Sequence, residues 1–191
     1  MTSTRETILK SAARVFARTG YRAATMQVIA AEAGFTPPTL YAHFGTKRGL
    51  FDGLVENVTG ELLQLFEREV PEGLSLAQLL ELRVRHLLEL AERERDVFVL
   101  FVLRPYDLPT VDEADHDEQH ARLHQHWKHV FAGHPNELGD RSPREAALLV
   151  EGILYAWVKD WLQEGSAPLA SQTRRLVELI LRGAIGGAGD R

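Results

Sequence analysis

Residues 25–47, TMQVIAAEAGFTPPTLYAHFGTK, constrain the fold of the chain more than any other segment. Their pattern predicts two short helices that are joined by a tight turn at Gly34, where a left-handed residue can end the first helix. Thr25 is a suitable N-cap for the first helix. Thr36 and the two prolines that follow it are typical of the start of the second helix. The segment is therefore predicted to form a helix-turn-helix.

The second of these helices has one apolar face and one polar face. Leu40 and Phe44 lie four residues apart, so both can point into the protein. Three polar side chains then point outward: Thr39, Tyr41 and His43. No carboxylate follows Glu32 within the segment. Hydroxyl, phenol and imidazole groups without a nearby carboxylate are suited to contact with DNA. Considered alone, Tyr41 as a core residue and His43 as an idle surface group are the simpler alternatives, but Leu40 and Phe44 already fill the inward face.

The charge distribution supports a nucleic-acid partner for the N-terminal part only. The net charge is −5 overall. Residues 1–50 contain seven Lys or Arg residues and two acidic ones, which leaves 15 of the 22 basic and 25 of the 27 acidic residues in the rest of the chain. A basic segment on an acidic body predicts that only the first segment meets phosphate groups.

The remaining composition excludes several classes of protein. The chain has no cysteine, which rules out disulfides, thiolate metal sites and cysteine nucleophiles. No apolar run approaches the roughly 20 residues of a membrane span, and the N-terminus lacks the apolar core of a signal peptide. We therefore expect a cytoplasmic protein with no membrane partner. HExxH, GxSxG and Gly-rich phosphate-loop motifs are absent, so we expect no enzyme activity and no cofactor.

Helical periodicity continues through the rest of the chain and predicts an all-α fold. The pattern predicts an N-terminal three-helix bundle, with Phe16, Ile29, Leu40 and Phe44 in its core, followed by a six-helix body. Residues 97–103 are β-branched and aromatic, but no partner strand is visible, so we interpret them as a buried helix. Ser142 and Glu145, with Pro143 between them, form a strong predicted helix start. We place the boundary between a DNA-binding domain and a ligand-binding and dimerisation domain at 1–46 and 47–191.

The N-terminal block closely resembles the TetR family of transcriptional regulators. The matching residues are Phe16, Gly20, Thr25, Ile29, Ala30, Ala33, Gly34, Thr39, Leu40, Tyr41, Phe44, Lys47, Leu50 and Phe51. The resemblance covers about the first quarter of the chain. It implies a homodimer that binds a palindromic double-stranded DNA operator, and a variable body that binds a small-molecule effector and releases the DNA. We expect a repressor with a small apolar effector.

The resemblance also assigns DNA contacts. It implies that Thr25 caps its helix and touches a phosphate, that Tyr41 and His43 donate to backbone phosphates, and that Lys47 meets another phosphate. Such contacts set the register on DNA without reading its sequence. From the chemistry of their side chains, Thr36 and Thr39 are our candidates for contacts with base edges.

Two features depart from the common pattern of the family. Pro37 and Pro38 occupy the entry to the second helix, which implies base readout through proline contact and DNA shape. Pro38 disfavours helical geometry at Pro37, so we expect the helix to begin one residue late. Arg48 follows Lys47 where acidic residues are common, and we interpret it as an additional phosphate clamp.

Six of the eight histidines lie between residues 116 and 134. His116, His120 and His124 are four residues apart and share one helix face, as metal-binding pairs do. A metal-responsive regulator that uses this face is the alternative function, although a solvated polar face is the simpler interpretation and we assign no metal. A metal hydrolase on the same face and a helical protein-interaction module are the two remaining alternatives.

Aromatic and apolar residues of the body supply two further hypotheses. We expect aromatic side chains to line an apolar effector pocket between helices: Phe98, Phe101, Tyr106, Trp127, Phe131 and Tyr155. The helix predicted for residues 143–164 is apolar over more than one face, which indicates burial against a second subunit as well. The predicted dimer interface consists of Leu149, Ile153, Trp157, Trp161, Leu176 and Ile180.

Overall fold

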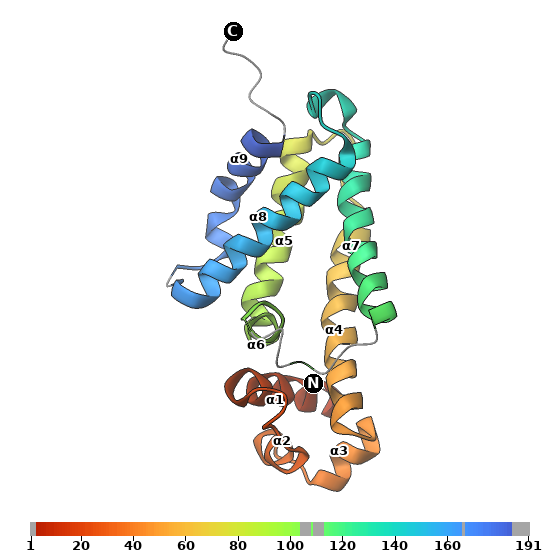
Figure 1. Ribbon diagram of the computed structural model, residues 1–191, viewed down its shortest axis with the longest axis vertical. Coiled ribbons are helices and arrows are strands. Elements are labelled where there is room, and N and C mark those ends of the chain that lie inside the picture. The colour runs from red at the N-terminus through yellow and green to blue at the C-terminus, as the bar shows by residue number, and fades with distance from the viewer. Residues whose placement is uncertain (1–2, 104–107, 109–112, 166, 185–191) are drawn as a thin grey trace. The chain divides into compact units, whose positions relative to one another are not determined.

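The computed structural model describes residues 3–103, 108, 113–165 and 167–184, with the backbone alone for residues 113–120 and 184. Nine α-helices and no strand occur in these ranges, which confirms the predicted all-α fold (Figure 1). The α-helices are α1 (Thr4–Thr19), α2 (Met26–Ala33), α3 (Pro37–Phe44), α4 (Lys47–Glu67), α5 (Leu76–Arg93), α6 (Arg95–Phe98), α7 (Glu113–Ala132), α8 (Pro143–Glu164) and α9 (Thr173–Ala184). Across these ranges, no helix combines the length and the apolar character that crossing a membrane requires.

The chain forms two compact units. Unit 1 consists of Met1–Glu61 and Glu94–Asp112, and unit 2 consists of Leu62–Arg93 and Glu113–Arg191. Helix α4 contributes its first part to unit 1 and its last turns to unit 2. The functional boundary that the sequence predicts at residue 46 concerns DNA binding and regulation, and it stays a prediction.

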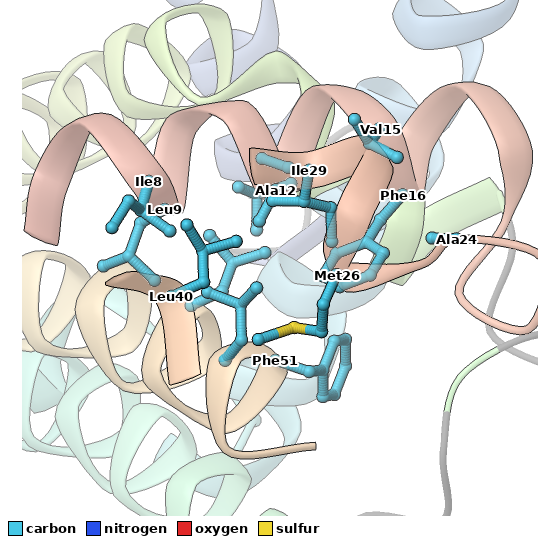
Figure 2. Close-up of a cluster of buried hydrophobic side chains, with 14 of the residues drawn as sticks. Ile8, Leu9, Ala12, Val15, Phe16, Ala24, Met26, Ile29, Leu40 and Phe51 are labelled. Carbon is cyan, nitrogen blue, oxygen red and sulfur yellow. The ribbon is translucent and has the colours of Figure 1, made fainter. Parts of the chain in front are cut away.

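Unit 1 is built on an apolar core that all four of its N-terminal helices share. Phe16 of α1, Ile29 of α2 and Leu40 of α3 are fully buried there, together with Phe51 of α4, and Phe44 packs against the cluster (Figure 2). Three of the core residues predicted from the sequence, Phe16, Ile29 and Leu40, are thus confirmed as core, and the fourth, Phe44, is half-buried at its edge. Ser3 caps α1 by accepting a hydrogen bond from the Glu6 amide at 3.2 Å.

Residues 95–103 are helical, as predicted, but in two forms. Helix α6 leads directly into one π-helical turn, Val99–Leu103. Val97 and Leu100 are fully buried in the core of unit 1, where α6 packs against α1. The β-branched composition therefore reflects burial from several sides rather than a strand.

Unit 2 is a bundle in which α8 packs against α7 and α9, and α9 packs against α5. Ser142 and Glu145 form the predicted capping box at the start of α8, with the Glu145 carboxylate accepting from the Ser142 amide at 2.8 Å. This reciprocal pairing satisfies two amides that a helix start leaves without partners. Trp127 and Phe131 of α7 are fully buried in this bundle.

Candidate nucleic-acid interface

Helix α2 begins and ends as the sequence predicts. The Thr25 side chain accepts a hydrogen bond from the Val28 amide at 3.3 Å. At the other end Gly34 is left-handed, with φ 74°. The Phe35 amide donates to the Ala30 carbonyl at 2.9 Å, which closes the turn beneath the helix. These two ends fix where α3 can begin.

Helix α3 begins at Pro37, so the expected delay of one residue is wrong. Thr36 is the N-cap, and the Leu40 amide donates to the Thr36 carbonyl at 3.4 Å. Both prolines lie in the first turn, where backbone amides have no partner within the helix, so the missing N–H groups cost nothing. The prolines therefore start α3 rather than delay it.

The outward surface of α3 is polar and free of carboxylates. Tyr41 is 46% exposed. Thr36, Pro38 and His43 are exposed as well, while Pro37 and Thr39 are half-buried. The hydroxyls of Thr36 and Thr39 lie 3.0 Å apart and share a hydrogen bond. The side chains predicted to meet DNA in this helix are thus exposed or half-buried, while Leu40 lies in the core.

Glu32 is the only acidic residue between residues 25 and 47, and its charge is countered within unit 1. Its carboxylate oxygens lie 3.2 Å from Arg14 Nε and 3.3 Å from Arg18 Nη2. Both arginines belong to α1. Two cations around one carboxylate leave the surface beside α3 with a positive balance, which favours an anionic partner.

Lys47 lies at the start of α4 and points toward the loop between α1 and α2. Its ammonium donates to the carbonyls of Tyr21 at 2.9 Å, Arg22 at 3.3 Å and Ala24 at 2.9 Å. It also lies 4.5 Å from the centre of the Tyr21 ring, a cation–π distance. Burial raises the pKa of the Tyr21 phenol. Lys47 therefore holds the loop that leads into Thr25, a role that the spacing of residues does not reveal.

The second cation of the Lys-Arg pair has a partner on its own helix. Arg48 Nε lies 2.7 Å from the Asp52 carboxylate, one turn further along α4. The sequence analysis also missed Thr46, whose hydroxyl accepts from the Gly49 amide at 2.9 Å and so caps α4. A threonine directly before the first residue of a predicted helix is the sequence signal that identifies such a cap. Asp52 and Thr46 together offset the repulsion between Arg48 and the helix dipole.

Gly49 allows α3 and α4 to approach closely. A Cβ atom added at this position would lie 2.3 Å from the Phe44 carbonyl oxygen, far inside any contact distance. Because Phe44 ends α3, any side chain at residue 49 would push the two helices apart. The close approach of α3 and α4 therefore requires glycine at this position.

Comparison with known proteins agrees with this geometry. Residues 8–54 match the family model described as bacterial regulatory proteins, tetR family. The chain is 28% identical to the HTH-type transcriptional regulator AcrR of Shigella flexneri, over 93% of this chain and 87% of that protein. Residues 8–54 of the chain thus carry the pattern of the TetR family.

Solved structures of other regulators share the fold over nearly the whole chain. The transcriptional regulator FadR of Bacillus subtilis, in complex with stearoyl-CoA, superposes with a TM-score of 0.78 at 17% identity, over 96% of this chain and 98% of its own. NalD, the secondary repressor of a multidrug efflux pump in Pseudomonas aeruginosa, gives 0.73 at 20% identity, over 97% and 98%. The match of residues 8–54 to the tetR family model and the likeness to AcrR support a DNA-binding transcription regulator rather than an enzyme, as the sequence predicts.

The residues predicted to line an effector pocket divide between unit 1 and unit 2. Phe98 and Phe101 pack against the core of unit 1. Trp127 and Phe131 are fully buried in unit 2, whereas Tyr155 on α8 is 49% exposed. Tyr106 lies outside the described residues. The pocket assignment stays a prediction, with Trp127 and Phe131 as its buried members in unit 2.

The residues predicted for the dimer interface differ in how much surface they leave for a partner. Leu149 is 38% exposed, and Ile153 and Trp157 are half-buried. Three others are buried within their own chain: Trp161, Leu176 and Ile180. The indole of Trp157 donates to the Gln172 side chain at 3.0 Å. Sequence analysis missed the exposed apolar side chains of the same helices, namely Leu148 and Tyr155 of α8 and Leu179 of α9.

Of the three histidines predicted to share one face of α7, only His124 has a described side chain. His124 Nδ1 lies 3.2 Å from both carboxylate oxygens of Glu151 on α8. The side chains of His116 and His120 lie outside the described residues. Among the described side chains, no group of three metal-ligating residues comes together. The metal-responsive alternative stays a prediction.

Proposed function

We propose that this TetR-family protein is a cytoplasmic homodimeric repressor that binds a palindromic operator through α2 and α3 and leaves it when an effector binds. The observation that carries the proposal is the exposed, carboxylate-free surface of α3, beside a Glu32 that two arginines neutralise. On such a surface Tyr41 and His43 donate hydrogen bonds to DNA phosphates, and Thr36, Thr39 and the prolines remain for base edges and DNA shape.

The contacts at the N-termini of the helices support the same arrangement. Thr25 caps α2, and its exposed position suits a phosphate at that helix start. Arg48 is half-buried beside Asp52 and carries the second cation of this surface. Lys47 supports the loop before α2. The phosphate contact predicted for Lys47 stays a prediction, and the salt dependence of operator binding can test it.

The exposed apolar residues of α8 and α9 support a dimer. Leu148, Leu149 and Tyr155 share one face of α8, and Leu179 is exposed on α9. Burial of these four side chains against a second copy would remove apolar surface that a monomer leaves in water. A two-fold dimer also matches DNA, because recognition helices about 34–36 Å apart reach successive major grooves. Repression is the role of NalD, and binding of a long-chain acyl compound is recorded for FadR. Both support a repressor with an apolar effector here.

The test is operator binding by a Tyr41 variant and by a control variant in unit 2. Fragments upstream of the protein's own gene locate an operator by gel shift, and fluorescence anisotropy then gives the Kd. Tyr41→Phe removes one hydroxyl donor to phosphate, which we expect to weaken binding about ten- to a hundredfold. His129→Gln, at an exposed position of α7, leaves the Kd unchanged. Equal Kd values for both variants, or no shifted fragment, would refute the proposal.

A further inference from the structure

Three nitrogen atoms in unit 2 are buried without a hydrogen-bond partner among the described residues: Arg83 Nε, His86 Nδ1 and Trp127 Nε1. Arg83 and His86 lie one turn apart on α5, and Trp127 lies on α7. Trp127 is fully buried and Arg83 is only 7% exposed. Buried polar groups without partners are rare, so a cluster of them indicates a missing partner.

The Arg83 guanidinium is a buried cation without a buried anion. Its two terminal nitrogens donate to backbone carbonyls at the end of α4, those of Leu65 and, at 3.0 Å, Arg68. In the described part of the chain no carboxylate lies within ion-pair distance of it. The two carbonyls satisfy hydrogen bonds but bring no negative charge. Buried charges are normally paired with an opposite charge. Within the residues that the structure describes, the positive charge of the Arg83 guanidinium lacks such a partner, and its Nε atom lacks a hydrogen-bond acceptor.

One aromatic ring connects the cation with the indole. The Arg83 guanidinium carbon lies 5.8 Å from the centre of the Phe66 ring. The Trp127 ring contacts the same phenyl group edge-on, with centroids 4.9 Å apart, and His126 stacks on it at 5.5 Å. Arg83 and Trp127 are therefore neighbours across Phe66. Phe66 is buried, as are several leucines of α5, the helix that carries Arg83.

We propose that this cluster binds the acid group of an effector with an apolar body. The inference rests on the proposed effector-responsive function and specifies the chemical class of the effector. Arg83 Nε and Trp127 Nε1 are donors only, and His86 Nδ1 is a donor in one tautomer. A carboxylate supplies several acceptor lone pairs and the negative charge that Arg83 lacks. A neutral water molecule would satisfy the donors but would leave the charge unmatched.

A purely structural role for Arg83 makes a different prediction. If Arg83 only ties α5 to the last carbonyls of α4, a carboxylate gains nothing over a neutral molecule of the same shape. If the cluster binds an acid, the carboxylate binds more tightly by the strength of a charge-assisted hydrogen bond, about tenfold or more. The comparison of matched acids and alcohols therefore separates the two roles.

The experiment measures binding of two acid–alcohol pairs to the full-length protein. The probes are decanoate with 1-decanol, and 4-phenylbutyrate with 4-phenyl-1-butanol. Calorimetry gives each Kd, and fluorescence follows the Trp127 indole, with Trp127→Phe identifying its signal. We expect at least one acid to bind about tenfold or more tightly than its alcohol. Equal or weaker binding of both acids would overturn the proposal.

Two variants test the residues. Arg83→Met abolishes the preference for the acid while the alcohol still binds. Because Arg83 also holds the end of α4, Trp127→Phe serves as a second variant that keeps this contact and reduces the acid preference alone. His129→Gln, at an exposed position of α7, leaves the preference unchanged. A preference that survives both Arg83→Met and Trp127→Phe would refute the site.

A gel shift with the operator separates this proposal from the function on which it rests. Operator release by the alcohol but not by the acid overturns the acid site and leaves the repressor proposal standing. Acid binding that depends on Arg83, without any operator binding by the ligand-free protein, supports the site and refutes the repressor proposal.

Discussion

Replacement of Lys47 by methionine tests the role that the structure gives to this lysine. The ammonium holds the carbonyls of Tyr21, Arg22 and Ala24 at 2.9, 3.3 and 2.9 Å. Methionine keeps most of the aliphatic stem and removes all three donors. The Arg22 residue is exposed, so its carbonyl can bind water, but the hydrogen bonds to Tyr21 and Ala24 are part-buried.

The expected loss of stability follows from those two carbonyls. A hydrogen bond from a charged donor contributes about 1.5–3 kcal/mol, and a buried acceptor without a partner costs about 1–3 kcal/mol. Because such terms are not additive, we expect Lys47→Met to lower the free energy of unfolding by about 2–4 kcal/mol. Urea denaturation followed by circular dichroism measures this change.

Arg48→Met is the matched control, because it removes the same charge one residue away. The ion pair of Arg48 with Asp52 is about 40% exposed on both sides, and exposed pairs at this spacing contribute about 0.3–0.5 kcal/mol. We expect a loss of stability close to that range. A similar loss in both variants would contradict the inward role of Lys47.

The salt dependence of operator binding provides a second readout. A lysine that contacts a phosphate contributes about 0.9 to the slope of log K against log salt concentration. If Lys47 positions the loop before α2, Lys47→Met weakens operator binding but leaves this slope unchanged. A slope that falls by about 0.9 with no change in stability would refute the reasoning and favour the phosphate contact.

Two further predictions concern stability alone. The methyl group added by Gly49→Ala would meet the Phe44 carbonyl, so this variant should lower the free energy of unfolding by about 1–3 kcal/mol. Gly60→Ala lies in the same helix with no atom within 4 Å of the added Cβ, and it should raise the free energy of unfolding by about 0.5–1 kcal/mol. Equal effects of the two variants in urea denaturation would contradict the close approach of α3 and α4. Burial lowers the pKa of His126 in the folded state, so the unfolded state binds the proton first, and stability should fall as the pH drops below about 6.5. His126→Gln should reduce this decline in pH-dependent urea denaturation while His129→Gln does not, and identical pH profiles would contradict burial as its cause.

The helices and the capped turn could be predicted because their causes are local. Thr25, Gly34 and the Ser142–Glu145 box act within three or four residues, so spacing alone identifies them. The inward positions of α3 follow from the same periodicity. These are features for which one stretch of sequence contains both partners of each interaction.

Lys47 and Arg83 show why the rest could not be predicted. The partners of Lys47 lie 23 to 26 residues away, and those of Arg83 lie 15 and 18 residues away. No periodicity connects a lysine at a helix start to the carbonyls of an earlier loop. The α9 residues Leu176 and Ile180 show the same limit, because an apolar stripe does not reveal whether its own chain or a second copy covers it.

Helix α4 connects the two findings, because one cation holds each of its ends. At its start, Lys47 fixes the loop that leads into α2, in unit 1. At its end, Arg83 holds the Leu65 and Arg68 carbonyls, in unit 2. An acid at this site would bind the same guanidinium that donates to those two carbonyls. The binding free energy of the acid therefore depends on the hydrogen bonds between Arg83 and the end of α4. If the proposed function and the proposed acid site both hold, linkage predicts that the acid favours one way of holding α4 over another, which the helix would pass to the loop before α2. Operator release is therefore expected to need both cations, each for a contact at its own end of α4.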